Sequence, residues 1–381
     1  MTKSMDMKSV AILSKTGAEH VRENPTLSAL KICGVDVHAA MIASDRPTLS
    51  RRTRGSENKV LVRVRAFSCN YRDLSFIIER ALDPGASLSI IGSDFSGDVV
   101  AIGAGVTSLS VGDRVIPDSA LHSDSGAYAR AAPGIPTNKA SSEYLLLDEE
   151  QLIGLPRGLS YREGAAFTIG AQTAYSMARR GGIRSNDDVL VTAGRSNTAL
   201  FAIAALKARG ARVSVLTTST GFEKKFIELG AHAVFAPDLT HDQFLSSEPV
   251  LEFAAAIGGF AAVIDPYFDI YLSKVLPLLR PRGSYVTCGL FEQHYTALAK
   301  MVLPSGMTDY RSAMLMAMRQ NHVIHANCLG TREDLENALK DCDAGRTKVP
   351  IDSVIRNGDV AKFLDRTYTA QDRFGKVVFE Y

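Results

Sequence analysis

The chain has few cysteines, and their arrangement limits what they can do. The five cysteines of this 381-residue protein are scattered and never form a C-x-x-C pair: Cys33, Cys69, Cys288, Cys328 and Cys342. An odd, dispersed set disfavours both a disulfide framework and a structural zinc site, which needs closely spaced ligands. Free thiols suit a reducing compartment, so we expect a cytoplasmic protein.

Long apolar runs and an excess of charge of one sign are missing as well. No stretch approaches the ~18 apolar residues of a membrane span, and the N-terminal MTKSMDMKSVAIL lacks the apolar core of a signal peptide. The formal net charge is only +2, which gives no reason to expect nucleic acid or an anionic membrane as a partner. The remaining composition, 46% apolar and 22% charged, is typical of a globular protein.

The length and a change in residue pattern predict two domains. Residues 1–154 are β-rich: Lys59–Ala66 alternates apolar and basic residues, Asp98–Gly103 is a second strand candidate, and Ser108–Pro117 carries a Gly-Asp turn before a third. Residues 118–142 are rich in Ser, Ala, Gly and Pro and predict a loop. Residues 155–320 form the second domain. Residues 321–381 could complete either domain, and we assign them to the first.

Strand-like and helical runs alternate in the second domain, which predicts βαβ units and a parallel sheet. The expected strands are Val189–Thr192, Arg212–Thr217, Ala233–Phe235, Ala261–Asp265, Ser284–Cys288 and one near His322–Asn327. The expected helices are Thr198–Arg209, Gly221–Leu229, Leu272–Leu279, a Met-rich helix after residue 311 and one from Arg332. A final strand is expected at Lys376–Glu380. The pattern as a whole indicates an α/β protein.

The segment from residue 188 to residue 210 predicts a strand, a turn and a helix that hold a dinucleotide. A helix N-terminus exposes unpaired N–H groups that bind phosphate. Of the usual fingerprint glycines only Gly194 is present. Polar residues replace the others and can donate to phosphate or cap the helix, and the expected contacts are Gly194, Arg195, Ser196, Asn197 and Thr198. The alternative is an ordinary strand–helix turn with a good N-cap.

The end of the next strand favours NADPH over NADH. NAD sites place an Asp or Glu there for the ribose hydroxyls, but Val215–Ser219 contains no acid. Thr218, Ser219 and Lys224 offer hydroxyls and a cation, which suit a 2′-phosphate. The alternative is that Lys224 and Lys225 are a solvated lysine pair at a helix start.

Six ordered motifs make the chain resemble the medium-chain dehydrogenase/reductase superfamily, and within it the zinc-free quinone oxidoreductase and enoyl reductase branch. They extend over nearly the whole chain from Lys59 and run Ala66–Asp73 (AFSCNYRD), Ile91–Val100 (IGSDFSGDVV), Val111–Val115 (VGDRV), Ala165–Tyr175 (AAFTIGAQTAY), Leu278–Gly289 (LLRPRGSYVTCG) and Phe374–Val378 (FGKVV). The resemblance implies a GroES-like β-rich catalytic domain built from both chain ends and a Rossmann doubly wound parallel sheet inserted between them.

The same comparison predicts that no catalytic zinc is bound. Zinc-dependent relatives place a Cys where Asn70 stands and a His where Ser93 stands, and Ile169 occupies the third ligand position. Zinc needs three or four N, S or O ligands. Without a metal to polarise a carbonyl, the easier reaction is hydride transfer from NADPH to an activated C=C, followed by protonation of the enolate.

The resemblance also assigns roles to individual residues. Tyr71 is the candidate proton donor or enolate-facing hydroxyl, and Asn70 a donor to the substrate oxygen; the alternatives are a packing aromatic and a turn cap. Arg72 and Asp73 are expected to form a structural ion pair at a helix start. Residues expected near the cofactor are Thr173, whose alternative is an N-cap, Cys288, Gly289, Leu290, Asn327, Leu329 and Lys376, the last through a phosphate.

The sequence therefore predicts a zinc-independent, NADPH-dependent reductase of an activated C=C (an enone, an enoyl thioester or a dehydroamino acid) or of a quinone. Its expected partner is a small-molecule substrate, for example a natural-product intermediate. A metal-free carbonyl or alcohol oxidoreductase and a non-catalytic NADPH-binding sensor are the alternatives. The family often dimerises through an edge strand, and His322–Asn327 is the candidate strand for a homodimer.

Overall fold

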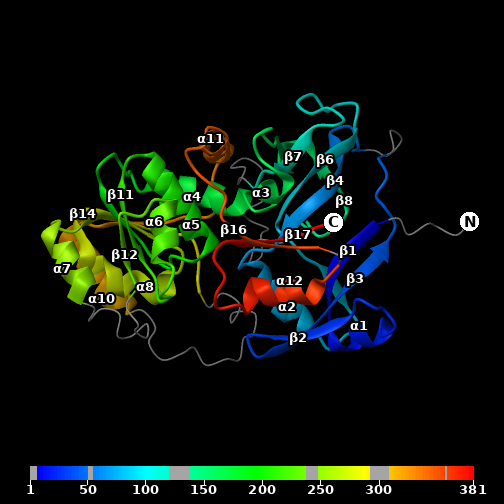
Figure 1. Ribbon diagram of the computed structural model, residues 1–381, viewed down its shortest axis with the longest axis horizontal. Helices are drawn as coiled ribbons and strands as arrows, with labels where there is room; N and C mark the ends of the chain where they lie inside the picture. Colours follow the sequence, from blue (N-terminus) through cyan, green and yellow to red (C-terminus); the bar gives the residue numbers. More distant parts are fainter. Residues whose placement is uncertain (1–6, 50–54, 120–137, 237–247, 292–308, 357) are drawn as a thin grey trace, which may run out of the picture. The chain divides into compact units, whose positions relative to one another are not determined.

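The computed structural model describes residues 7–49, 55–119, 138–236, 248–291, 309–356 and 358–381 (Figure 1). Most of the loop expected at 118–142 lies outside them. The chain divides into two compact units: Met1–Ile169 with Ile351–Tyr381, and Gly170–Gln293 with Lys300–Pro350. The division thus falls at 169/170 and 350/351, later than the 154/155 and 320/321 boundaries expected from the sequence. Within the described residues, no helix has the length and apolar character needed to cross a membrane.

The first unit is built on two sheets. One runs β16 (Ile351–Ile355), β17 (Lys376–Glu380), β4 (Lys59–Ser68), β6 (Asp94–Ile102), β7 (Arg114–Pro117) and β9 (Leu152–Gly154), with β8 (Tyr144–Asp148) also paired to β4. The other runs β2 (Ser28–Ile32), β3 (Val35–Ser44), β1 (Met7–Leu13) and β5 (Leu88–Ile90). The C-terminal strand β17, red in Figure 1, pairs antiparallel with β4 from the N-terminal half. Both chain ends therefore build this unit.

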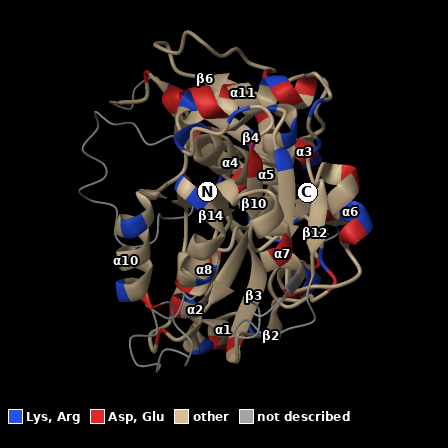
Figure 2. Ribbon diagram, turned by 90° about the vertical axis from the view of Figure 1, so that its left-hand side faces the viewer, with Lys and Arg blue, Asp and Glu red and all other residues tan. Residues whose placement is uncertain are grey.

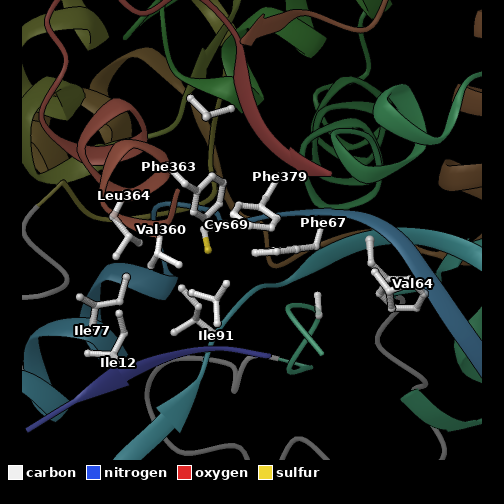
Figure 3. Close-up of a cluster of buried hydrophobic side chains, with 14 of the residues drawn as sticks. Ile12, Val64, Phe67, Cys69, Ile77, Ile91, Val360, Phe363, Leu364 and Phe379 are labelled. Atoms are coloured by element: carbon white, nitrogen blue, oxygen red, sulfur yellow. The ribbon is translucent and has the colours of Figure 1, made fainter. Parts of the chain in front are cut away.

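Short helices cover the first unit. They are α1 (Lys15–His20), α2 (Asp73–Ala81), α3 (Tyr161–Ala165) and α12 (Val360–Tyr368), and α4 (Thr168–Arg180) begins at its boundary. Phe67 of β4 packs edge-on against Phe363 of α12, with ring centroids 5.2 Å apart, and lies 5.1 Å from Phe379 of β17. Figure 3 shows these rings beside Cys69, whose sulfur points among aliphatic side chains. Each buried ring stabilises the fold by about 1.5–3 kcal/mol.

The second unit contains a parallel sheet in the order β12 (Ala233–Phe235), β11 (Arg212–Leu216), β10 (Asp188–Val191), β13 (Phe260–Asp265), β14 (Leu279–Thr287) and β15 (Val323–Ala326). Every pairing along it is parallel. The chain moves outward from β10 to β12 and then returns to β13 on the other side of β10. This reversal is the switch point of a doubly wound sheet, so the expected α/β fold is confirmed.

Five helices of the described residues connect the strands of this sheet: α5 (Asn197–Ala208), α6 (Glu223–Leu229), α7 (Glu248–Ala256), α8 (Phe268–Val275) and α10 (Tyr310–Gln320). Helix α11 (Arg332–Asp343) follows the last strand, β15. All residues of α5 from Ala199 to Leu206 are buried, which is typical of a helix in the core. By contrast, α6 and α11 carry charges of both signs (Figure 2).

Two elements differ from the expectation. Strand β14 begins at Leu279 rather than Ser284, because it continues through Pro-Arg-Gly with a register shift instead of turning there. Arg282 has a positive φ of 63° in that bulge. Helix α8 begins at Phe268 and ends at Val275, where Pro277 converts the chain to a short 3₁₀ turn, Leu276–Leu278.

Candidate active site

The turn between β10 and α5 depends on close packing. A Cβ on Gly194 would lie 2.5 Å from Cγ1 of Val215 on β11 and 3.1 Å from the ring of Phe226. Only glycine fits at this distance, although its own φ is not positive. The positive φ of 47° falls on Ala193 instead. The single remaining fingerprint glycine is therefore required for strand–helix approach, one of the roles glycines have in dinucleotide turns.

Ser196 caps helix α5. Its hydroxyl accepts a hydrogen bond from the backbone N–H of Ala199 at 3.2 Å. The helix dipole and the other first-turn N–H groups then favour an anion at this end. Thr198 is half-buried in the first turn.

Asn197 stands out because its side-chain amide is buried without a partner. Neither Oδ1 nor Nδ2 has a hydrogen bond within the part of the chain that the structure describes. A Cβ on Gly170 of α4 would lie 2.3 Å from Nδ2, so the amide packs against that helix. An unpaired buried amide costs stability, and a dinucleotide bound at the turn could supply its missing partner. The residues present therefore fit a nicotinamide cofactor.

Cationic side chains gather beside the loop that follows β11. The guanidinium of Arg195 lies 5.0 Å from the ring centroid of Phe222, and the ammonium of Lys225 lies 5.4 Å from it. Thr218 and Lys224 are exposed and Ser219 is half-buried. The ring of Phe222 in the β11–α6 loop thus contacts Arg195 from the β10–α5 turn and Lys225 from α6, so positive charge from both elements lies against the ring.

Asp265 ends strand β13 and was not anticipated. It is fully buried and accepts hydrogen bonds from Thr192 Oγ1 at 2.6 Å, from the N–H of Tyr267 at 2.9 Å and from the hydroxyl of Tyr285. Desolvation raises the pKa of Asp265 to about 6, against the opposing effect of these hydrogen bonds. In the sequence, the acid that ends the apolar run AAVID was the signal for a buried carboxyl at this position.

The segment after β14 contains the next expected contacts. Cys288 lies just beyond the strand, and desolvation raises the pKa of its thiol to about 12, so it stays protonated. The carbonyl of Gly289 accepts from the N–H of Phe268 at 3.2 Å, and Leu290 is half-buried. A neutral thiol and backbone groups at this position suit packing rather than nucleophilic chemistry.

Asn327 has a structural role that the sequence did not suggest. Its Oδ1 accepts from Ser176 Oγ at 2.9 Å and from Arg180 at 3.3 Å, and its Nδ2 donates to the carbonyl of Leu329 at 2.7 Å. Leu329 has a positive φ of 52°. The Asn327 amide therefore holds a strained loop, and its contact with the cofactor stays a prediction.

Thr173 lies within helix α4 and is buried. Because α4 begins at Thr168, the alternative of an N-cap for Thr173 is wrong. A contact between Thr173 and the cofactor stays a prediction.

In the first unit, Asn70 is the centre of a buried polar cluster. Its backbone N–H donates to Asp73 Oδ2 at 2.6 Å and its Nδ2 donates to Asp94 Oδ2 at 2.8 Å. Lys376 donates to Asn70 Oδ1 and, at 3.3 Å, to Asp94 Oδ2. Ser93 donates to Asp73. We call these residues the Asn70 cluster: Asn70, Asp73, Ser93, Asp94 and Lys376.

Lys376 is enclosed within the Asn70 cluster. It is 2% exposed, and its ammonium is bonded to Asn70 and Asp94. Desolvation lowers the pKa of Lys376, and the two carboxylates of the cluster oppose that effect. Reaching a cofactor phosphate would require the ammonium to leave both partners, and that contact stays a prediction.

The three positions compared above with zinc ligands, Asn70, Ser93 and Ile169, all make hydrogen bonds. Asn70 and Ser93 bond within the cluster, while Ile169 donates its backbone N–H to Asp94 Oδ1 at 3.0 Å. No group of three or more potential His, Cys, Asp or Glu ligands occurs in the described ranges. Tyr71 is half-buried against the first unit's core. Asp73 begins helix α2, as expected, and Arg72 acts on it electrostatically.

Comparison with known proteins places these features in context. Residues 56–157 match the family described as the alcohol dehydrogenase GroES-like domain. The (R,R)-butanediol dehydrogenase of Bacillus subtilis is 35% identical over 188 residues, 47% of this chain and 51% of that protein. The quinone oxidoreductase of Pseudomonas aeruginosa is 33% identical over 168 residues, 44% of this chain and 46% of that protein. The chain thus spans about half the length of these relatives.

Solved structures resemble the fold over almost the whole chain. A putative alcohol dehydrogenase from Sinorhizobium meliloti 1021 has a TM-score of 0.71 at 24% identity, covering 98% of this chain and 99% of that chain. A 2-octenoyl-CoA carboxylase reductase in complex with NADP and 2-octenoyl-CoA has a TM-score of 0.72 at 18% identity, covering 98% and 87%. At these identities the likeness establishes the shared fold.

Proposed function

We propose that this protein is a nicotinamide-dependent oxidoreductase. The premise is that residues 56–157 match the alcohol dehydrogenase GroES-like family and that the chain has the medium-chain dehydrogenase/reductase fold. The observation that carries the proposal is the dinucleotide turn. Gly194 allows close approach of β11, Ser196 caps α5, and the Asn197 amide has no partner among the described residues.

The proposed cofactor is NADPH. The loop after β11 offers the Thr218 hydroxyl, and the first turn of α6 offers the Lys224 ammonium, where an NAD site would place an acid. Arg195 adds a second cation beside the same loop. A 2′-phosphate carries close to two negative charges, and cations of this kind stabilise it, whereas NADH has no group to satisfy them.

The proposed reaction is reduction of an activated C=C or of a quinone. NADPH supplies the hydride when bound. Asn70 donates an N–H to the substrate oxygen and so stabilises the enolate that develops there. Tyr71 donates the proton. Because Asn70 and Ser93 are engaged inside the cluster, oxygen stabilisation through this amide replaces a metal, and the reaction is proposed to be zinc-independent.

Cofactor titration is the first test. The chain has no tryptophan, so binding is followed through the emission of the reduced nicotinamide without interfering indole fluorescence. NADPH should bind at least tenfold more tightly than NADH. Lys224→Glu should weaken NADPH binding and leave NADH binding unchanged, while Lys348→Glu, another exposed lysine of the same unit, should change neither.

Turnover with a substrate panel is the second test. An enone, an enoyl thioester, a quinone and an aldehyde are offered with NADPH after dialysis against a zinc chelator. Reduction of the C=C or quinone substrates supports the proposal, and reduction of the aldehyde alone would favour a carbonyl reductase. Tight NADPH binding without any turnover would favour a sensor, and no binding of either cofactor would exclude both enzyme assignments.

We also propose that two copies associate through β15. This strand ends the order of the parallel sheet in the described residues, so one side of its backbone is available for pairing. The neighbouring α10 exposes Met314, Leu315 and Met318, and in Figure 2 it is mostly uncharged apart from Lys or Arg towards its two ends. Sedimentation velocity should give a dimer, and Met318→Glu should shift it towards monomer. A monomeric wild type would exclude the proposal.

A further inference from the structure

Every hydrogen-bonding group of Asn70 faces a fixed partner, with one exception. The backbone N–H donates to Asp73, and the backbone carbonyl accepts from the Tyr368 hydroxyl at 3.1 Å. The side-chain Oδ1 accepts from Lys376, and one Nδ2 hydrogen is donated to Asp94. An amide nitrogen has two hydrogens. Among the residues that the structure describes, Asp94 is the one acceptor of Nδ2, so the second Nδ2 hydrogen remains for a ligand.

The two side-chain partners also decide which way the amide points. An ammonium can only donate hydrogen bonds, and an ionised carboxylate can only accept them. With Lys376 on one side and Asp94 on the other, Oδ1 must face the lysine and Nδ2 the aspartate. Two neutral partners able both to donate and to accept would permit either orientation.

The buried charges of Lys376 and Asp94 compensate each other. Asp94 is fully buried, and its Oδ1 is already held by the N–H of Ile169. A buried carboxylate is costly unless a nearby cation compensates it. Lys376 supplies that charge from β17, at the other end of the chain from β6.

Burial separates the two possible roles of Lys376. Its ammonium is enclosed, whereas Asn70 is only half-buried. A substrate oxygen can therefore accept a hydrogen bond from the Asn70 amide but not from the Lys376 ammonium. We propose that Lys376 is a positioning residue: with Asp94 it fixes the Asn70 amide so that one N–H is presented to the substrate oxygen. This inference rests on the proposed function of Asn70.

The kinetic test is a double-mutant cycle on the full-length protein. Lys376→Met should lower kcat for the best panel substrate roughly 10–100-fold, because a misplaced donor loses transition-state contact. In an Asn70→Ala background the same change should have no further effect. Independent, multiplicative losses from the two substitutions would overturn the proposal. Lys362→Met, an exposed lysine of the same unit, is the matched control and should leave kcat unchanged.

Two further measurements keep the test decisive. The NADPH dissociation constant of Lys376→Met should stay within twofold of wild type, and a large rise with unchanged kcat would instead assign Lys376 to the cofactor phosphate. If Lys376→Met unfolds, Asp94→Asn/Lys376→Met removes both buried charges together. The amide orientation is then no longer unique, so this variant should also lose kcat; retention of wild-type kcat would overturn the proposal.

A readout that does not need turnover separates this inference from the proposed function. The side-chain amide ¹⁵N–¹H signals of Asn70, assigned by their loss in Asn70→Ala, should be resolved and slow to exchange in wild type and Lys362→Met. They should shift and exchange faster in Lys376→Met. Unchanged signals there would overturn the positioning role, even if the wild type reduced no substrate on the panel and the proposed function had failed.

Discussion

Asp265 should make the second unit lose stability as the pH rises through about 6. Burial raises its pKa from an ordinary 3.8 to about 6, so the folded unit binds a proton more tightly than the unfolded chain does. Stability from this group is therefore fully present below pH 4 and is lost as the pH rises through about 6. A pKa raised from 3.8 to about 6 corresponds to about 3 kcal/mol in all, of which about 1 kcal/mol is lost between pH 5 and pH 8.

Asp265→Asn imitates the protonated acid and removes this dependence. The new Oδ1 can still accept from Thr192 and from the N–H of Tyr267, and the Tyr285 hydroxyl can rotate to accept from Nδ2. Relative to wild type, the stability of the variant should therefore rise by about 1 kcal/mol between pH 5 and pH 8. For a unit of this size that is a relative rise in Tm of roughly 2–4 °C.

Thermal unfolding of both proteins at pH 5, 6, 7 and 8 measures this difference. Asp334→Asn is the control with the opposite sign. Burial raises the pKa of Asp334, but hydrogen bonds from Arg179 and Thr331 outweigh it and lower the pKa overall, so its stabilisation is lost only as the pH falls below about 4. Its difference from wild type should be constant between pH 5 and 8. Parallel Tm profiles for wild type and Asp265→Asn would refute the reasoning.

Two further changes test the dinucleotide turn. Gly194→Ala places a Cβ 2.5 Å from Val215, so it should lower the free energy of unfolding by about 1–3 kcal/mol and weaken NADPH binding. The control is Gly154→Ala, where a Cβ meets nothing within 4 Å and the change should be neutral. Equal stabilities of the two variants in chemical denaturation would contradict the packing argument. Asn197→Ala removes an amide that lacks a partner, so the cofactor-free protein should keep or raise its Tm while the NADPH dissociation constant rises about tenfold. Unchanged NADPH affinity in calorimetry would show that the amide does not bind the cofactor.

The local pattern of apolar residues predicted most strands and helices of the second unit. Ala233–Phe235 was expected as a strand at the observed bounds. The expected strand Arg212–Thr217 differs from β11 by one residue at its end, and the expected helix Thr198–Arg209 differs from α5 by one residue at each end. Alternation of short apolar strands with Ala- and Leu-rich helices leaves few arrangements other than a parallel sheet. The N-terminal strands and helix α12 of the first unit were not predicted, because their burial depends on partners distant in the chain: β1 pairs with β5, and Phe363 of α12 packs against Phe67.

The sequence alone determined the fold class, the turn with its one remaining glycine and the replacement of the zinc-ligand residues at Asn70 and Ser93. The tertiary structure decided what the polar residues do. It assigned Lys376 to Asn70 and Asp94, 282 residues from the latter, turned Asn327 into a support for a strained loop and raised the pKa of Asp265 by burial. Periodicity encodes which face of an element is buried, but the partner of a buried charge is fixed only when distant strands meet.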